Sequence, residues 1–132
     1  MFEGYKKILI VDDEKDTVHF LEKGLSREGF EVITAFDGVE AKNKIVYDEP
    51  DIIILDLVMP GLDGWGVLSW LKEKKKVIPT IIVSAKEELV DMKKGILDAD
   101  TYLVKPVSVS DIVKGINVIA SLRAGGKEKE QA

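Results

Sequence analysis

Five side chains that can act as ligands, nucleophiles or charges directly follow short apolar runs of the chain. They are Asp12, Asp13, Asp56, Ser84 and Lys105. The chain has no Cys and a single His, so a metal held here has oxygen ligands, which favours Mg²⁺ and allows Mn²⁺. A cation, a lysine and a hydroxyl are the parts that stabilise a transferring phosphoryl group. Asp56 follows the middle run and is the best placed nucleophile.

The apolar runs themselves predict a parallel sheet. Short, unalternating runs rich in β-branched residues are typical of strands buried on both faces, and they lie at 8–11, 52–55, 81–83 and 102–104. A weaker, alternating run at 31–34 indicates an edge strand. Helical spacing of apolar residues predicts helices at 15–28, 38–47, 65–74, 87–97 and 109–122, with Gly29 ending the first. This order predicts an α/β fold with a single doubly wound five-stranded parallel sheet and flanking helices.

The predicted sheet explains how distant residues meet. Ligands of an open parallel sheet bind outside the carboxyl ends of its strands. Each of the four strongest apolar runs carries its reactive residue at that end. We therefore expect three carboxylates, one hydroxyl and one ammonium group in a single small cleft. Without a bound cation the three carboxylates would repel one another.

Length and charge limit the remaining possibilities. A chain of 132 residues with net charge −5 fits one domain and is a poor partner for nucleic acid. It has no apolar run long enough for a membrane helix and no recognisable secretory signal, so we expect a cytoplasmic location and no membrane binding. We assign residues 1–122 to the domain. Residues 123–132 contain no apolar residue larger than Ala and are expected to form a polar flexible tail or the start of a linker.

Each candidate residue also has a purely structural explanation. Asp12 and Asp13 are of a type favoured for capping the helix that follows. Asp56 and Ser84 are common at loop openings, and Lys105 precedes a proline, which ends a strand. The agreement of four separate strand ends favours the functional interpretation.

Four blocks of sequence resemble the receiver domain of two-component response regulators, the family that includes the chemotaxis regulators. They are Ile-Leu-Ile-Val-Asp-Asp-Glu at 8–14, Asp-Ile-Ile-Ile-Leu-Asp-Leu-Val-Met-Pro-Gly at 51–61, Pro-Thr-Ile-Ile-Val-Ser-Ala at 79–85 and Tyr-Leu-Val-Lys-Pro at 102–106. The resemblance covers residues 6–122. It implies a flavodoxin-like sheet with strand order 2-1-3-4-5.

The resemblance implies a role for each acidic residue. Asp56 matches the phosphoacceptor, which takes a phosphoryl group from a histidine kinase or a histidine phosphotransfer protein. Asp13 and Asp56 match direct Mg²⁺ ligands, and the backbone carbonyl of Val58 matches a third. Asp12 matches a residue that acts on the metal largely through water.

Three further residues match the parts that respond to phosphorylation. Lys105 matches the lysine that pairs with phosphoryl oxygens, and its bond to Pro106 matches one that is usually cis. Ser84 matches the switch hydroxyl and Tyr102 the switch aromatic residue.

The function implied is signalling rather than enzymatic turnover. Phosphorylation of Asp56 with Mg²⁺ would switch an output surface of approximately residues 87–122, which acts on a downstream protein or on an output domain missing from this chain. The alternative is a degenerate receiver that works as a phosphorylation-independent protein-interaction module. An aspartyl phosphatase would need a second acid where Val58 stands, and a flavin module would need a phosphate loop where the chain has Asp-Asp-Glu-Lys-Asp at 12–16.

Overall fold

The strands predicted from the apolar runs form one parallel sheet. Its strands are β1 (Lys7–Val11), β2 (Glu31–Ala35), β3 (Ile52–Leu55), β4 (Thr80–Ser84) and β5 (Thr101–Val104). They pair in the order β2-β1-β3-β4-β5, and every pairing is parallel. The computed structural model describes residues 5–59, 61–85 and 100–131, with residues 123–131 as backbone only. The fold class and strand order predicted from the sequence are confirmed.

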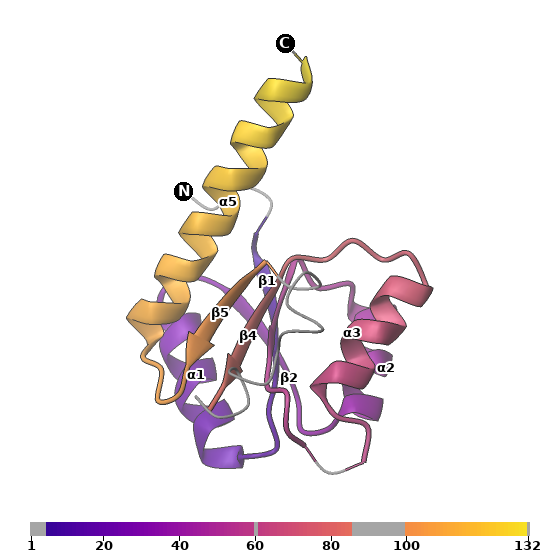
Figure 1. Ribbon diagram of the computed structural model, residues 1–132. Helices are drawn as coiled ribbons and strands as arrows, with labels where there is room; N and C mark the ends of the chain where they lie inside the picture. Colours follow the sequence, from indigo (N-terminus) through magenta and orange to yellow (C-terminus); the bar gives the residue numbers. More distant parts are fainter. Residues whose placement is uncertain (1–4, 60, 86–99, 132) are drawn as a thin grey trace.

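Helices cover both faces of the sheet (Figure 1). The first face carries α1 (Lys15–Arg27) and α5 (Val109–Gln131), and the second carries α2 (Gly38–Asp48) and α3 (Gly64–Glu73). All four helices lie where the apolar spacing predicts them, although α5 is longer than expected. The helix predicted at 87–97 lies outside the described residues. Among the described residues, no helix combines the length and the apolar character needed to cross a bilayer.

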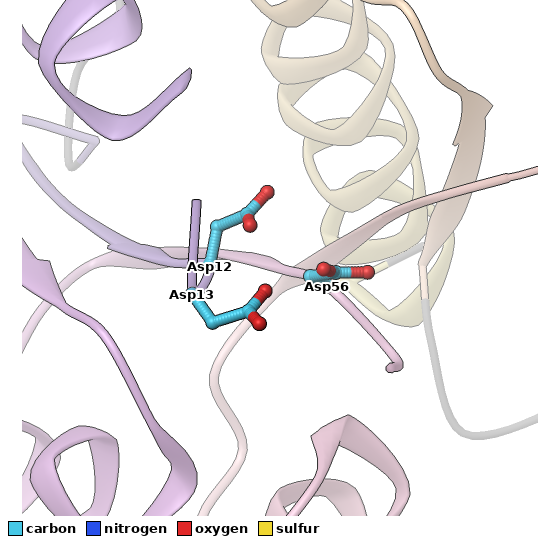
Figure 2. A group of neighbouring side chains, drawn as sticks. All are labelled: Asp12, Asp13 and Asp56. Atoms are coloured by element: carbon cyan, nitrogen blue, oxygen red, sulfur yellow. The ribbon is translucent and has the colours of Figure 1, made fainter. Parts of the chain in front are cut away.

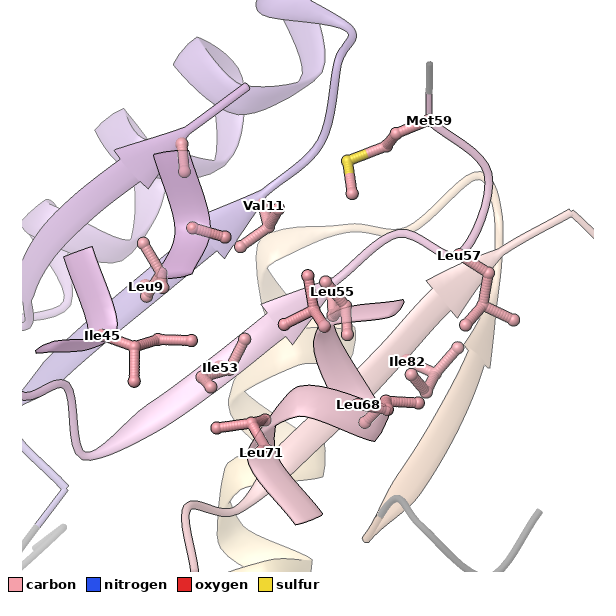
Figure 3. Packing of buried hydrophobic residues seen from close by; sticks show 13 residues of the cluster. Leu9, Val11, Ile45, Ile53, Leu55, Leu57, Met59, Leu68, Leu71 and Ile82 are labelled. Atoms are coloured by element: carbon pink, nitrogen blue, oxygen red, sulfur yellow. The ribbon is translucent and has the colours of Figure 1, made fainter. Parts of the chain in front are cut away.

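Each sheet face has its own hydrophobic core because neighbouring side chains on a strand point to opposite faces. In β1, Leu9 and Val11 face α2 and α3, whereas Ile8 and Ile10 face α1 and α5. Figure 3 shows the first of these cores, where Leu68 and Leu71 of α3 pack against the strands. Burying one such side chain contributes about 1.5–3 kcal/mol, so the two cores fix the sheet that positions the strand ends.

The end of α1 follows the predicted glycine signal. Gly29 has a φ of 100°, a left-handed conformation that costs glycine little. The Gly29 amide donates to the carbonyl of Ser26, and the Phe30 amide donates to that of Leu25. This pair of bonds is the Schellman motif, and it turns the chain from α1 into β2.

Two sequence-based expectations are corrected. The run at 102–104 was expected to be buried on both faces, but β5 is an edge strand whose side chains are partly buried or, at Val104, exposed. The prediction that this strand is buried was wrong because a short apolar segment does not reveal whether its strand has one neighbouring strand or two.

The second correction concerns the end of the chain. The last helix was predicted to end at residue 122, yet α5 continues to Gln131 and extends beyond the sheet (Figure 1). The role of residues 123–132 as a flexible tail or the start of a linker stays a prediction. Most residues after Leu122 are Ala, Arg, Lys, Glu or Gln, which have high helix propensity. The pair Gly125-Gly126 costs about 1 kcal/mol per glycine relative to alanine, which is too little to end a helix already nucleated by its packed first turns.

Candidate functional site

Three carboxylates meet at the carboxyl edge of the sheet. Figure 2 shows Asp12 and Asp13 at the end of β1, beside Asp56 at the end of β3. One carboxylate oxygen from each lies within 4.8 Å of the others. Asp12 and Asp56 are buried, whereas Asp13 is exposed at the mouth of the cluster. The predicted convergence of these three residues is confirmed.

The sheet register brings Asp12 and Asp56 to the same level. Val11 and Leu55, the last residues of β1 and β3, are paired directly. The amide of Asp56 donates to the carbonyl of Val11 at 2.9 Å, which extends the ladder by one residue. The amide of Asp12 donates to the carbonyl of Ala35 on the other side, at 3.1 Å. Backbone hydrogen bonds therefore fix the main chain of both residues at the end of the sheet.

Lys105 reaches the cluster from the edge strand. Its amide donates to the carbonyl of Ser84 at 2.9 Å, and its bond to Pro106 is cis, as the resemblance implied. The Lys105 Nζ atom lies 2.9 Å from Asp12 Oδ2 and 3.2 Å from Asp56 Oδ2. The predicted lysine thus bridges the two buried carboxylates, which places positive charge where burial would otherwise isolate negative charge.

The other oxygen of Asp56 also has partners. The Ser84 hydroxyl donates to Asp56 Oδ1 at 3.3 Å, and the amide of Val58 donates to the same oxygen at 3.3 Å. Ser84 is buried at the end of β4. All five side chains predicted from the strand ends therefore lie in one site. Val58 contributes its amide here, and its carbonyl as a metal ligand stays a prediction.

The electrostatics of Asp56 reflect its crowded surroundings. Burial raises the pKa of this carboxyl group, and the negative charge of Asp12 raises it further; the ammonium group of Lys105 and the hydrogen bond from Val58 oppose the shift without cancelling it. Burial alone would lower the pKa of Lys105, but Asp12, Asp56 and Glu14 outweigh burial and raise that pKa above its ordinary value. The site thus holds more negative charge than its single lysine balances.

The carboxylate cluster fits a hard divalent cation. It offers only oxygen atoms, which lie within 4.8 Å of one another, and burial first and the charge of Asp12 second raise the pKa of Asp56, so a bound cation would favour its ionised form. Asp13 is exposed to solvent beside the two buried carboxylates, so it is accessible to a hydrated ion, and Mg²⁺ keeps several water ligands. Asp12, Asp13 and Asp56 are the side chains that would hold it.

The capping interpretation of Asp12 and Asp13 is wrong. The residue at the start of α1 is Glu14, and no side chain caps the helix there. Asp12 Oδ1 instead accepts the amide of Glu14 at 2.9 Å, just before the helix begins. Tyr102, expected as the switch aromatic residue, packs against the core on the α2 and α3 side, and its hydroxyl oxygen is buried.

Glu14 belongs to the site and was not singled out from the sequence. Its Oε1 atom lies 3.1 Å from Lys105 Nζ. The available signal was its position directly after the two aspartates. The sequence argument, however, considered only residues that directly follow a strand, and Glu14 is the third residue after β1. Lys105 is thus surrounded by three carboxylates, from Asp12, Glu14 and Asp56.

A doubly wound parallel sheet binds its ligands outside the carboxyl ends of its strands, and here that edge carries an acidic site bridged by a lysine. The family model for the response regulator receiver domain matches residues 8–117. The chain belongs to this family. It is a receiver domain of the two-component response regulators.

Individual relatives agree with this assignment. The alkaline phosphatase synthesis transcriptional regulatory protein PhoP of Bacillus subtilis (strain 168) is 42% identical over 115 residues, which cover 86% of this chain and 48% of that protein. The chain spans about half the length of the curated relatives it matches.

Solved structures show the same fold. The Francisella response regulator 1452 receiver domain superposes with a TM-score of 0.80 at 31% identity, covering 89% of this chain and 98% of that one. The response regulator protein TrrA of Thermotoga maritima, in complex with Mg(2+)-BeF, gives a TM-score of 0.76 at 33% identity, covering 85% and 96%.

Proposed function

We propose that this receiver domain accepts a phosphoryl group on Asp56, with Mg²⁺, from a histidine kinase or a histidine phosphotransfer protein. The observation that carries the proposal is the contact of Lys105 Nζ with Asp56 Oδ2 at 3.2 Å, inside a cluster of three carboxylates. A carboxylate nucleophile beside a fixed ammonium group and a cation site is the arrangement that phosphoryl transfer requires. The Mg²⁺–BeF complex of the relative TrrA is consistent with such a site.

The transfer itself needs few groups from the protein. A carboxylate oxygen of Asp56 attacks the phosphorus atom, the phosphorus–nitrogen bond of the phosphohistidine breaks, and the imidazole leaves with a proton from solvent. The cation supplies charge neutralisation for the phosphoryl oxygens when bound. Lys105 orients those oxygens, and the backbone bonds that hold Asp56 keep the nucleophile in line.

Phosphorylation then changes the hydrogen bonds of the site. A phosphoryl group adds a charge of about −1.5 to −2 and three acceptor oxygens. The Ser84 hydroxyl, now on Asp56 Oδ1, moves to a phosphoryl oxygen, and Tyr102 responds to the vacated space. The change biases an existing equilibrium of the output surface, approximately residues 87–122, of which residues 87–99 lie outside the described part.

We further propose that the domain is a cytoplasmic signalling part and not a turnover enzyme. Its output is a downstream protein or an output domain, since the chain spans about half the length of its curated relatives. Direct binding of nucleic acid by this chain is not expected at a net charge of −5.

Intact mass spectrometry tests the proposal. The protein is incubated with phosphoramidate and Mg²⁺, and the mass of one phosphoryl group is expected to appear. It should be absent in Asp56→Asn and in the presence of a chelator, and it should persist in Asp16→Asn, which removes an exposed carboxylate of α1. No gain of mass with any donor or kinase would contradict the proposal and favour a phosphorylation-independent interaction module.

A further inference from the structure

Glu14 differs from the two other carboxylates that contact Lys105. Its Oε1 atom lies 3.1 Å from Lys105 Nζ, but its side chain is 63% exposed, whereas those of Asp12 and Asp56 are 6% exposed. An exposed ion pair contributes little and is released easily, while a buried pair is costly to break. Glu14 is therefore the partner that Lys105 gives up first.

The backbone explains why this side chain is available. The Glu14 amide donates to Asp12 Oδ1 at 2.9 Å, which fixes the backbone of Glu14 beside the carboxylate cluster. Glu14 opens α1, yet its carboxylate makes no capping hydrogen bond with that helix. It instead lines, with Asp16, Phe20 and Lys105, a cavity of about 530 Å³ between the start of α1 and the turn after β5.

The ammonium group of Lys105 has as many donors as it has carboxylate partners. A lysine carries three N–H groups, and Asp12, Glu14 and Asp56 lie at 2.9, 3.1 and 3.2 Å from Nζ. A phosphoryl group on Asp56 gains a hydrogen bond from Lys105 only if one of these carboxylates is released. The carboxylate of Glu14 also places negative charge beside an incoming anionic donor.

We propose that Glu14 is a positioning residue that acts through Lys105 and slows the phosphorylation of Asp56. This inference rests on the proposed function of Asp56. Glu14 holds the ammonium group toward the solvent side of the site, and its release allows Lys105 to engage the phosphoryl oxygens. Removing the carboxylate of Glu14 therefore speeds phosphorylation by a small anionic donor.

A kinetic double-mutant cycle tests the coupling. With saturating Mg²⁺ and phosphoramidate, Glu14→Gln is expected to raise the phosphorylation rate roughly two- to fivefold, the equivalent of an exposed ion pair. The matched control is Asp16→Asn, because Asp16 lines the same cavity but forms no ion pair with Lys105 among the described residues. In a Lys105→Met background, the effect of Glu14→Gln should disappear, since the partner is gone. An equal effect of Asp16→Asn, or an effect that persists without Lys105, would overturn the proposal.

A second measurement does not depend on phosphorylation. In a nitrogen–proton correlation spectrum of the lysine ammonium groups of the metal-free protein, the Lys105 signal is assigned by its loss in Lys105→Met. Glu14→Gln should shift this signal and speed its hydrogen exchange, and Asp16→Asn should leave it in place. An unchanged Lys105 signal in Glu14→Gln contradicts the proposal. If the wild type instead takes up no phosphoryl group while the signal shifts as expected, the proposed function fails and the hold of Glu14 on Lys105 stands.

Discussion

A Cβ atom on Gly64 would lie 2.2 Å from the backbone carbonyl oxygen of Asp56 and 2.7 Å from the Cα atom of Leu57. Both neighbours are backbone atoms next to the proposed phosphoacceptor and cannot rotate away. The Gly64 amide donates to the carbonyl of Leu57 at 3.0 Å. The first residue of α3 is thus packed directly on the loop that presents Asp56, and only a glycine fits there.

Gly64→Ala is expected to destabilise the fold by about 2–3 kcal/mol, because overpacking against backbone forces the loop or the helix to shift. The control is Gly115→Ala in α5, where the new Cβ atom would lie 3.1 Å from Ile81 Cδ1, the flexible end of a side chain. There the gain in helix propensity offsets a small adjustment, so stability should change little. Urea unfolding of both variants measures the difference, and equal stabilities would contradict the close packing.

Mg²⁺ is expected to stabilise the folded protein through Asp13. At a concentration of 100 times its dissociation constant, a ligand that binds only the folded state adds about 2.7 kcal/mol. Asp13→Asn should abolish most of this gain, because Asp13 is an exposed member of the carboxylate cluster whose loss leaves the cores intact. Asp16→Asn, an exposed acid outside the cluster, should keep the full gain. Unfolding curves with and without Mg²⁺ decide the point; no stabilisation of the wild type would argue against the metal site.

Asp56→Asn is expected to stabilise the metal-free protein at neutral pH. The folded state raises the pKa of Asp56, through burial first and the charge of Asp12 second, so it binds a proton more tightly than the unfolded state does. This contribution to stability is present below the ordinary pKa of an aspartate and is lost as the pH rises through the folded-state pKa. At neutral pH the ionised Asp56 therefore lowers the free energy of unfolding. When Asp56 is replaced, Lys105 still has Asp12 and Glu14 as partners.

The expected gain for Asp56→Asn is on the order of 1 kcal/mol at about pH 7.5 and smaller at about pH 4.5. Urea unfolding in a chelator at both pH values provides the measurement. A gain that grows as the pH falls, or a variant less stable than the wild type at neutral pH, would show that Lys105 stabilises the charge of Asp56 more than burial penalises it.

Much of the fold could be predicted because the pattern of apolar residues and the order of strands and helices along the chain determine a parallel α/β sheet. The strands ending at Val11, Leu55 and Ser84 are buried on both sheet faces, and their apolar runs are easily recognised in the sequence. The edge position of β5 left no such mark, since the burial of Val104 depends on what lies beside the strand. The continuation of α5 to Gln131 was missed because a polar segment of good helix formers resembles a flexible tail in composition.

The site could be predicted only as far as strand ends define it. Asp12, Asp56, Ser84 and Lys105 meet because register and parallel direction bring strand ends together. Glu14 was missed because its contact with Lys105 depends on the turn fixed by its amide on Asp12. Such a local bond in the loop has no periodicity that a sequence reveals.

The most direct test of the central claim is to locate the phosphoryl group. After phosphorylation with phosphoramidate and Mg²⁺, borohydride reduces an aspartyl phosphate to homoserine, which peptide mass mapping then places in the sequence. We predict homoserine at residue 56 alone, with none in the unphosphorylated protein, because among the aspartates that the structure describes only Asp56 is both buried and in contact with Lys105 and Ser84. Homoserine at residue 12 or 13, or at no aspartate of the cluster, would contradict the account.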